Sequence, residues 1–366
     1  MLVISKRQYT GKDLLDDRYG RLFELPAGLA RAGVAVHGIC ASYRRRKEGE
    51  FRFAELPNLS LQSVNLASGL IRLHATIRRA MHEFKPDVIW ASSDVPMLCA
   101  GAWIAKKYGV PFVADLYDNY ESFGLSRLPG AVPALRWACR RADRITVVSH
   151  TLRDYIRESY GSTAGIDVLG NGVRADIFYA GDRASARREL GLPDGARLIG
   201  TAGALVRGRG IGDLLKAYGL LAETDANLHL VLAGPRDDSI SAFSGDRVID
   251  LGILPHQKVG TLFRALDVGV ICNLDSSFGR YCFPLKLHEM QASGIPVVAA
   301  AVGDVAAYLS SCPDSLYMPG DAVTLASAVR SHLDGAGRCP SLSPDGWDSV
   351  SLRLKQVLEA AVSAPV

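Results

Sequence analysis

Short apolar runs rich in β-branched residues alternate with longer amphipathic segments along nearly the whole chain. In the first half these runs read LVIS, VAVHGIC, DVIWAS, PFVADLY, RITVVS and IDVLG. A second series follows in the second half, with RLIGTAG, LHLVLAG, RVIDLG, VGVIC and IPVVAAA. Strands that alternate with helices are typical of parallel sheets joined by crossover helices. The pattern therefore predicts an α/β fold with two consecutive parallel sheets.

The segments between these runs have the period of helices. In residues 70–84 the apolar positions fall on one face and the arginines on the other, and the helix is expected to end before Lys85 and Pro86. Residues 347–361 predict an isolated amphipathic helix, which follows a segment rich in glycine, proline and serine. Ligands of open parallel sheets bind outside the carboxyl ends of the strands. We therefore expect the site in a cleft between the two sheets.

Turn signals in LGNGVRADIFYAGD interrupt the apolar rhythm and place a linker near residues 171–182. The chain is expected to form three parts. These are an N-terminal α/β domain over residues 1–175, a C-terminal α/β domain over 176–345, and a helix over 346–366 that packs back toward the N-terminal domain.

Composition narrows the class of protein. Of 366 residues, 48% are hydrophobic and 22% are charged, which is typical of a globular chain. A net charge of +4 is too dilute to indicate a nucleic-acid-binding protein. The N-terminus lacks the apolar core of a signal peptide, and no window is long and apolar enough to span a membrane. We expect a cytoplasmic protein whose membrane contacts, if it makes any, come from its surface.

The cysteines do not form a recognisable framework. No C-x-x-C pair occurs, and the number of cysteines, seven, is odd. Structural zinc and a disulfide framework are therefore not expected, and most of these residues are expected to serve packing. They are Cys40, Cys99, Cys139, Cys272, Cys282, Cys312 and Cys339.

The most informative stretch is FGRYCFPLKLHEMQASGIPVVAAAVGD, residues 278–304. It resembles the donor-binding signature of the retaining glycosyltransferases of family 4, E-x-F-G-x-x-x-x-E-A-M-A-x-G-x-P-V-V-A. The family implies a GT-B fold with two Rossmann-like domains that face a central cleft. It also implies that the N-terminal domain, residues 1–175, binds the acceptor and that the C-terminal domain, residues 176–345, binds the nucleotide sugar. The positions that match in register are Phe283, Glu289, Met290, Ala292, Gly294, Pro296, Val297 and Val298.

This resemblance implies a nucleotide-sugar site. A turn at Phe283, Pro284 and Leu285 followed by a helix would present free N–H groups to a diphosphate. Glu289 is implied to hold the ribose hydroxyls, and Lys286 on the same helical face would add a charge to the phosphates. Tyr281 stands where the family has its first glutamate. It either contacts the sugar or is a partly buried aromatic residue.

The stretch GALVRGRGIGDLLKA, residues 203–217, resembles the family loop G-R-L-x-x-x-K-G-x-D-x-L-L-x-A, which brings two cations to the diphosphate. Arg209 occupies the lysine position, Ala204 the arginine position, and Arg207 is a candidate for the missing cation. Gly203 and Gly208 suit close approach of the backbone to an anion.

Other stretches also resemble family motifs, but they contain few side chains that could take part in the reaction. Gly234 ends a strand in LHLVLAGP, and Leu254 and Pro255 lie where the family has its nucleobase-side loop. IDVLGNGVRADIF resembles the family's hinge between the domains.

The first half of the chain matches more loosely. In PFVADLYDNYESF, Tyr117 and Asp118 stand where the family usually has His-Asp or His-Gly. Asp115, Asp118 and Glu121 would crowd one strand end, where acids fix sugar hydroxyls or assist the acceptor. Asp118 is the favoured contact to sugar or acceptor. The alternative is that these acids cap the following helix.

Two polar segments near the N-terminus are further candidates. Gly11, Asp16, Asp17 and Arg18 precede the first long helix and either meet the acceptor or form an ordinary acidic helix start. Residues 43–47, YRRRK, either contact anionic lipid or form a solvated loop.

The resemblance implies a retaining hexosyltransferase that uses a nucleotide-diphosphate sugar, needs no obligatory metal, and acts on a glycan or lipid-linked acceptor in cell-surface polysaccharide or lipopolysaccharide synthesis. Asp118, Arg209, Lys286 and Glu289 are its expected catalytic residues. Two alternatives remain open: a nucleotide-sugar epimerase or hydrolase on the same fold, and an inactive donor-binding assembly subunit, suggested by Ala204, Tyr281 and Tyr117.

Overall fold

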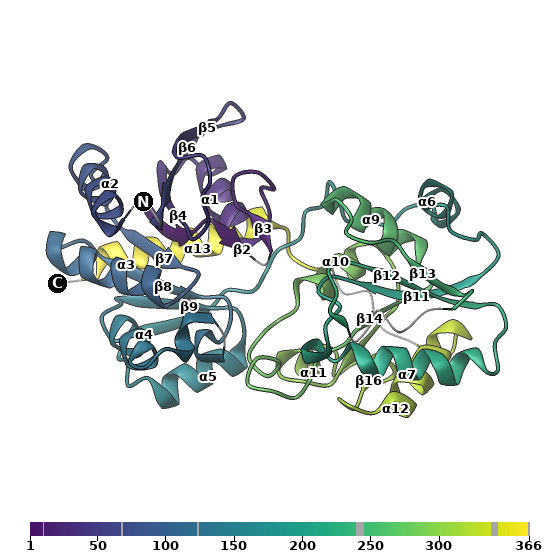
Figure 1. The fold of residues 1–366 in the computed structure, drawn as a ribbon. Coiled ribbons are helices and arrows are strands. Elements are labelled where there is room, and N and C mark those ends of the chain that lie inside the picture. Colours follow the sequence, from purple (N-terminus) through teal and green to yellow (C-terminus); the bar gives the residue numbers. More distant parts are fainter. Residues whose placement is uncertain (10, 67–68, 123, 239–244, 338–342, 365–366) are drawn as a thin grey trace. The chain divides into compact units, whose positions relative to one another are not determined.

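The chain folds into two compact units in the computed structural model, which describes residues 1–366 except 10, 67–68, 123, 239–244, 338–342 and 365–366 (Figure 1). Unit 1 comprises residues 1–172 with 347–366, and unit 2 comprises residues 173–346. The divisions expected after residues 175 and 345 lie close to these.

Unit 1 contains an eight-stranded sheet of order β10-β9-β8-β7-β1-β4-β6-β5. The neighbouring strands are parallel except for the edge pair β5–β6, which is antiparallel and was not predicted. The chain runs outward from β1 to one side and then returns to β7 on the other, so the strand order reverses between β1 and β7. The strands are β1 (Leu2–Lys6), β4 (Val36–Ser42), β5 (Gly49–Phe53), β6 (Leu56–Asn65), β7 (Ile89–Ser92), β8 (Phe112–Leu116), β9 (Arg144–Val147) and β10 (Gly165–Val168).

Helices connect the parallel strands of unit 1, as the periodicity predicts. The amphipathic segment 70–84 forms α2 and ends before Lys85. The helices are α1 (Arg21–Arg31), α2 (Leu70–Glu83), α3 (Val95–Tyr108), α4 (Ala131–Cys139), α5 (His150–Ser159) and α13 (Trp347–Ser363). Two short 3-10 helices, η2 (Tyr120–Ser122) and η3 (Gly124–Arg127), and a hairpin of β2 (Gln8–Tyr9) and β3 (Lys12–Asp13) complete the unit.

The C-terminal helix α13 belongs to unit 1, where it packs against α1 (Figure 1). The Ser351 hydroxyl donates a hydrogen bond to the Leu25 carbonyl at 3.4 Å. A Cβ atom on Gly28 would overlap the Ser351 hydroxyl, so the two helices approach closely because residue 28 has no side chain.

Unit 2 contains a six-stranded sheet of order β13-β12-β11-β14-β15-β16. Every neighbouring pair in it is parallel. The strands are β11 (Arg197–Ala202), β12 (Leu228–Ala233), β13 (Val248–Asp250), β14 (Val268–Ile271), β15 (Val297–Ala300) and β16 (Leu316–Tyr317). The helices are α6 (Arg183–Leu190), α7 (Ile211–Ala222), α9 (His256–Ala265), α10 (Leu285–Ala292), α11 (Asp304–Tyr308) and α12 (Ala322–Leu333), with 3-10 turns η4 (Arg207–Arg209) and η5 (Pro313–Ser315). The five predicted strands are confirmed, and only the short edge strand β16 was not predicted.

One cysteine departs from the expected packing role. Cys312 is disulfide-bonded, although its spacing gave no sign of a bond. Cys339 lies outside the described residues. The free cysteines are Cys40, Cys99, Cys139, Cys272 and Cys282, and burial is the largest cause that raises the pKa of each of the first four.

None of the helices in the described part of the chain is long and apolar enough to cross a membrane.

Two glycines close the ends of neighbouring strands in unit 2. Gly234 follows β12 with φ of 134°, and Gly203 follows β11 with φ of 114°. A Cβ atom on Gly234 would overlap the Gly203 carbonyl oxygen, whereas a Cβ atom on Gly203 would meet nothing within 4 Å. Gly234 is therefore required by both its backbone conformation and its surroundings.

We expect Gly234→Ala to destabilise unit 2 more than Gly203→Ala does. Backbone strain alone costs about 1–3 kcal/mol at such a position, and it applies to both variants. Only Gly234→Ala must also displace the facing backbone. Denaturant unfolding of the two variants measures the difference, and equal losses of stability would contradict the role given to this close approach.

Candidate functional site

The loop after β11 in unit 2 carries the cations expected at the diphosphate. The Arg209 guanidinium lies over the Phe278 ring, 3.7 Å from its centroid. The Arg207 amide donates a hydrogen bond to Asp237 at 3.0 Å, and the Arg207 side chain is exposed. Gly208 faces open space. Both arginine side chains are thus exposed, and Arg209 in addition packs on the Phe278 ring.

Helix α10 begins at Leu285, as the proline turn predicts, and Pro284 provides no side-chain cap to its first amides. The first N–H groups of such a helix carry a partial positive charge that attracts anions. Lys286, in the first turn, places its Nζ atom 3.4 Å from the Thr201 hydroxyl and 3.5 Å from the Ala202 carbonyl oxygen. Lys286 thus lies at the carboxyl end of β11.

The charges around Lys286 connect the predicted donor residues. Burial of its ammonium is the main cause that lowers the pKa of Lys286, and the Arg209 guanidinium lowers it further. The Cys272 thiol and the Glu289 carboxylate oppose this shift. Arg209 and Glu289 are therefore each close enough to Lys286 to affect its charge. The structure brings together three residues that the sequence identified separately.

Glu289 is buried, with 6% of its surface exposed. The His256 Nε2 atom lies 3.4 Å from its Oε1 atom. His256 opens α9 and packs against Phe178, with ring centroids 5.1 Å apart. The sequence analysis missed His256, although it directly follows Pro255 in a stretch that matches the family. A histidine at the start of a helix gives no signal that it meets a glutamate 33 residues away.

The other residues predicted to bind the donor mainly pack against neighbouring side chains or lie in turns. The Phe283 ring lies 4.9 Å from His288 and 5.5 Å from Tyr308. Leu254 packs against the core and Pro255 precedes α9. Tyr281 is partly buried in a turn.

Two acids at the end of β8 are already engaged, which corrects the expectation that three acids gather there for a ligand. Asp115 is fully buried and pairs with Arg21 at 2.7 Å. It also accepts hydrogen bonds from Ser92 and Thr146, each at 2.6 Å. Asp115 is thus a core residue that joins α1 to the centre of the sheet.

Glu121, expected to contact the acceptor, instead binds side chains of helices α4 and α5. Its carboxylate accepts from Arg136 at 2.9 Å and from the Tyr155 hydroxyl at 2.7 Å. Burial is the largest single effect and raises the pKa of this carboxyl, but the hydrogen bonds from Arg136 and Tyr155 and the charge of Arg136 act the other way, and the net result is a lowered pKa.

Tyr117 is a buried aromatic residue. Its hydroxyl donates to the Ser93 carbonyl oxygen at 3.2 Å, and its ring packs edge-on against Tyr9 and Tyr120. Asp118, the next residue, is partly buried, and its charge raises the pKa of Lys6 against the larger effect of burial. The structure thus places Asp118 near Lys6 at the end of β1.

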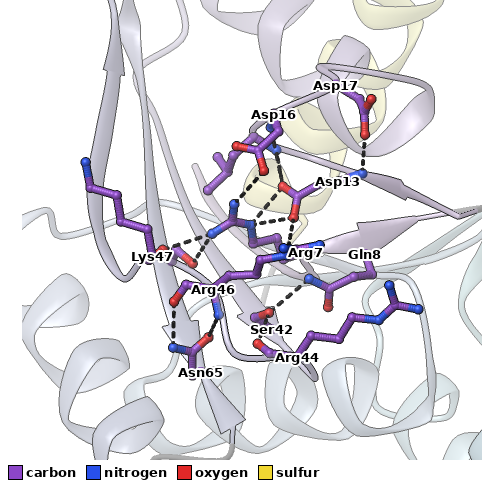
Figure 2. A network of polar contacts seen from close by, with 12 residues as sticks. Arg7, Gln8, Asp13, Asp16, Asp17, Ser42, Arg44, Arg46, Lys47 and Asn65 are labelled. Carbon is purple, nitrogen blue, oxygen red and sulfur yellow. Dashed lines mark hydrogen bonds and ion pairs between the residues drawn. The ribbon is translucent and has the colours of Figure 1, made fainter. Parts of the chain in front are cut away.

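The acidic segment before α1 forms internal contacts (Figure 2). Asp16 accepts from Arg7 at 3.2 Å, and Asp17 accepts from the Asp13 amide at 2.6 Å. Arg18 pairs with Glu55, and Gly11 forms the turn of the β2–β3 hairpin. The alternative of acidic helix caps is wrong, because α1 begins after Gly20 with no side-chain cap.

The basic loop at residues 43–47 has a fixed backbone (Figure 2). The Arg44 carbonyl accepts from Ser42 at 2.6 Å, and the Lys47 carbonyl accepts from the buried Arg7 at 2.9 Å. Asn65 bonds to both the amide and the carbonyl of Arg46. All five side chains of the loop are exposed.

Each half of the chain matches a known family of glycosyltransferases. The description Glycosyltransferase Family 4 matches residues 21–177, and Glycosyl transferases group 1 matches residues 196–334. The chain belongs to glycosyltransferase family 4. A curated relative, D-inositol 3-phosphate glycosyltransferase of Mycobacterium bovis (strain BCG / Pasteur 1173P2), is 30% identical over 295 residues, which are 74% of this chain and 56% of that protein. The chain thus spans about half the length of the curated relatives it matches.

Solved structures of this glycosyltransferase's neighbours show the fold. Sucrose-phosphate synthase from Thermosynechococcus elongatus superimposes with a TM-score of 0.78 at 19% identity and covers 100% of this chain and 99% of its own. Anabaena Alr3699/HepE in complex with UDP-glucose superimposes with a TM-score of 0.72 at 18% identity, covering 98% of each chain. The chain has the GT-B fold, with two Rossmann-like domains.

Proposed function

We propose that this glycosyltransferase transfers a hexose from a nucleotide-diphosphate sugar, with retention at the anomeric carbon, and that unit 2 binds the donor. The observation that carries the proposal is the convergence of Arg209, Lys286, the start of α10 and Glu289. Structures of similar fold were solved with UDP and with UDP-glucose, which supports a nucleotide sugar.

In this proposal the cations and the helix start stabilise the charge that develops on the departing diphosphate. Glu289 accepts hydrogen bonds from the ribose hydroxyls, and Asp118 contacts the sugar or acceptor. The acceptor oxygen bonds to the anomeric carbon while the bond from that carbon to the diphosphate breaks, and the diphosphate leaves with the acceptor's proton. No obligatory metal is part of this scheme.

The setting we propose is cell-surface polysaccharide or lipopolysaccharide synthesis, with a glycan or lipid-linked acceptor, in the cytoplasm and in part at the inner face of the membrane. The exposed basic loop at residues 43–47 supports contact with anionic lipid, since each basic residue near such a surface contributes about 1 kcal/mol.

Glu289→Ala is expected to weaken UDP binding by about 10- to 150-fold, because hydrogen bonds to a charged group contribute about 1.5–3 kcal/mol. Isothermal titration calorimetry with UDP measures this change. Glu223→Ala is the matched control, because Glu223 is an exposed glutamate of the same unit. Equal affinities in Glu289→Ala and the wild type would remove Glu289 from the donor site.

Product analysis without acceptor tests the alternative chemistries. A hydrolase needs two carboxylates that flank the scissile bond, and Asp115 is no longer a candidate because it is fully buried against Arg21. An epimerised or fully hydrolysed donor would favour the epimerase or hydrolase. Binding of donor without any turnover would favour the inactive assembly subunit suggested by Ala204 and Tyr281.

A further inference from the structure

A pocket of about 300 Å³ lies within unit 1, at the carboxyl ends of its four central strands. Lys6 ends β1, Tyr43 and Arg44 follow β4, Asp94 follows β7, and Tyr120 follows β8. The strand order of the sheet reverses between β1 and β7. Ligands of open α/β sheets bind at this reversal, because the connecting chains diverge there and leave a crevice.

The backbone beside the pocket is strained. Ser93 has φ of 100°, a conformation that residues other than glycine rarely adopt. Three hydrogen bonds hold it: the Lys6 amide donates to its hydroxyl at 2.8 Å, its own amide donates to the Tyr120 hydroxyl at 3.0 Å, and the Tyr117 hydroxyl donates to its carbonyl at 3.2 Å. Strain that several contacts maintain tends to occur where a ligand binds.

Two cations line this pocket. Over the described residues, neither the Lys6 ammonium nor the Arg44 guanidinium has a hydrogen bond or ion pair, although the charges of Asp94 and Asp118 act on Lys6 from a greater distance. Neighbouring arginines differ, since Arg7 pairs with Asp13 at 2.8 Å and Arg46 lies 3.7 Å from the same carboxylate. Figure 2 shows Arg44 pointing away from this cluster. Two unpaired cations at one pocket favour an anionic group on the ligand.

The other walls suit a hydroxylated ring. Asp94 accepts from the Tyr43 hydroxyl at 2.9 Å with one oxygen and caps α3 through the Met97 amide at 3.2 Å with the other. A carboxylate has further lone pairs, so Asp94 can accept a bond from a ligand hydroxyl. The rings of Tyr43 and Tyr120 offer apolar surface to the C–H face of a sugar.

The size of the pocket limits the ligand. At about 30 Å³ per water molecule, the pocket has room for about ten waters. It lies at the lower end of the range for small-molecule sites, about 300–1,000 Å³. One ring with one substituent matches this volume, whereas a longer glycan would extend beyond it.

We propose that this pocket binds the acceptor, and that the acceptor is a single-ring polyol or sugar bearing a phosphate, with the phosphate between Lys6 and Arg44 and a hydroxyl on Asp94. A phosphate monoester carries nearly two charges near neutral pH and so engages both cations. The assignment rests on the proposed function, and it moves the acceptor contacts from Asp16, Asp17, Arg18 and Glu121 to residues without internal ion pairs.

Calorimetry in saturating UDP tests the proposal with glucose 6-phosphate, fructose 6-phosphate and myo-inositol 1-phosphate, each against its unphosphorylated counterpart. Phosphatidylinositol 4-phosphate in phosphatidylcholine vesicles provides a lipid-linked form that carries the same phosphate monoester on its ring. We expect at least one phosphorylated ligand to bind, its parent polyol to bind about tenfold or more weakly, and Lys6→Met to weaken it by about 10- to 100-fold. Arg44→Gln should act in the same direction, and Arg79→Gln, in an exposed arginine of α2 that does not line the pocket, should have no effect.

The outcomes separate this inference from the proposed function. Binding of the soluble phosphates, or of phosphatidylinositol 4-phosphate vesicles, that Lys6→Met and Arg44→Gln weaken supports the inference and identifies the source of the phosphate. Equal binding of phosphorylated and parent compounds, binding that both variants leave unchanged, or no binding at all while UDP still binds would overturn it and leave the donor site standing. Failure of every nucleoside diphosphate tested, UDP included, to bind would overturn the proposed function and, with it, this inference. Because Arg44 is exposed, Arg44→Gln remains informative if Lys6→Met fails to fold.

Discussion

Arg21→Met is expected to lower the free energy of unfolding of unit 1 by about 3–5 kcal/mol, because removing one partner leaves a buried charge uncompensated. The side chains of Arg21 and Asp115 are both 0% exposed, and they pair at 2.7 Å. Arg21 also donates to the Leu169 carbonyl at 2.7 Å, so its loss leaves that acceptor without this donor. Urea unfolding monitored by circular dichroism measures the loss.

The same helix provides the control. Arg31 also lies in α1 and pairs with Asp348 at 2.7 Å, but its side chain is 41% exposed and that of its partner 72%. Arg31→Met is therefore expected to cost no more than about 1 kcal/mol. A second variant, Arg21→Met with Asp115→Leu, removes both charges and should recover part of the stability. Equal small losses for Arg21→Met and Arg31→Met would show that Asp115 is not the buried charge that this geometry indicates.

Lys286→Met is expected to lower kcat/KM by about 100- to 1,000-fold, the range for removing one group that stabilises charge in a transition state. The Lys286 ammonium lies at the end of β11, in the field of Arg209 and Glu289. Its positive charge would stabilise the negative charge that develops on the departing diphosphate. Steady-state kinetics with the donor found by calorimetry measures the change. Lys216→Met, in an exposed lysine of α7, is the control. Unchanged turnover in Lys286→Met would exclude the lysine from the reaction.

The same residue predicts a pH dependence. Burial lowers the pKa of Lys286 from its ordinary value of 10.5. Without a ligand, Lys286 therefore loses its proton at a lower pH than an exposed lysine does. A bound diphosphate stabilises the charged form and raises the pKa. UDP affinity should therefore be greatest below the lowered pKa and fall as pH rises through it. In Lys286→Met, UDP affinity no longer depends on the protonation of this lysine but still depends on any titration of the nucleotide. The difference between the pH profiles of UDP affinity in the wild type and in Lys286→Met therefore isolates Lys286. Parallel profiles would contradict the assignment.

The regular elements were predictable from the chain because they depend on local pattern. The runs DVIWAS and VGVIC became β7 and β14, and the periodic segment 70–84 became α2. Pro284 and the residues after it predicted the start of α10, since a proline suits the first positions of a helix. The neighbouring strands β5 and β6 were both missed. In β5 only Phe51 and Phe53 are apolar, and Pro57 with Asn58 near the start of β6 indicates a turn rather than a strand.

Family 4 membership and the order of the donor motifs were likewise contained in the sequence, because that resemblance depends on residue types at fixed spacing. Only the tertiary structure decided which charged groups are engaged. Asp115 and Arg21 are 94 positions apart, and nothing in either local sequence indicates their pairing. The same holds for His256 beside Glu289 and for the unpaired Lys6 beside the strained Ser93. Local sequence determines which segments are buried and in what form, whereas the partner of a polar side chain depends on distant segments that meet only when the sheet assembles.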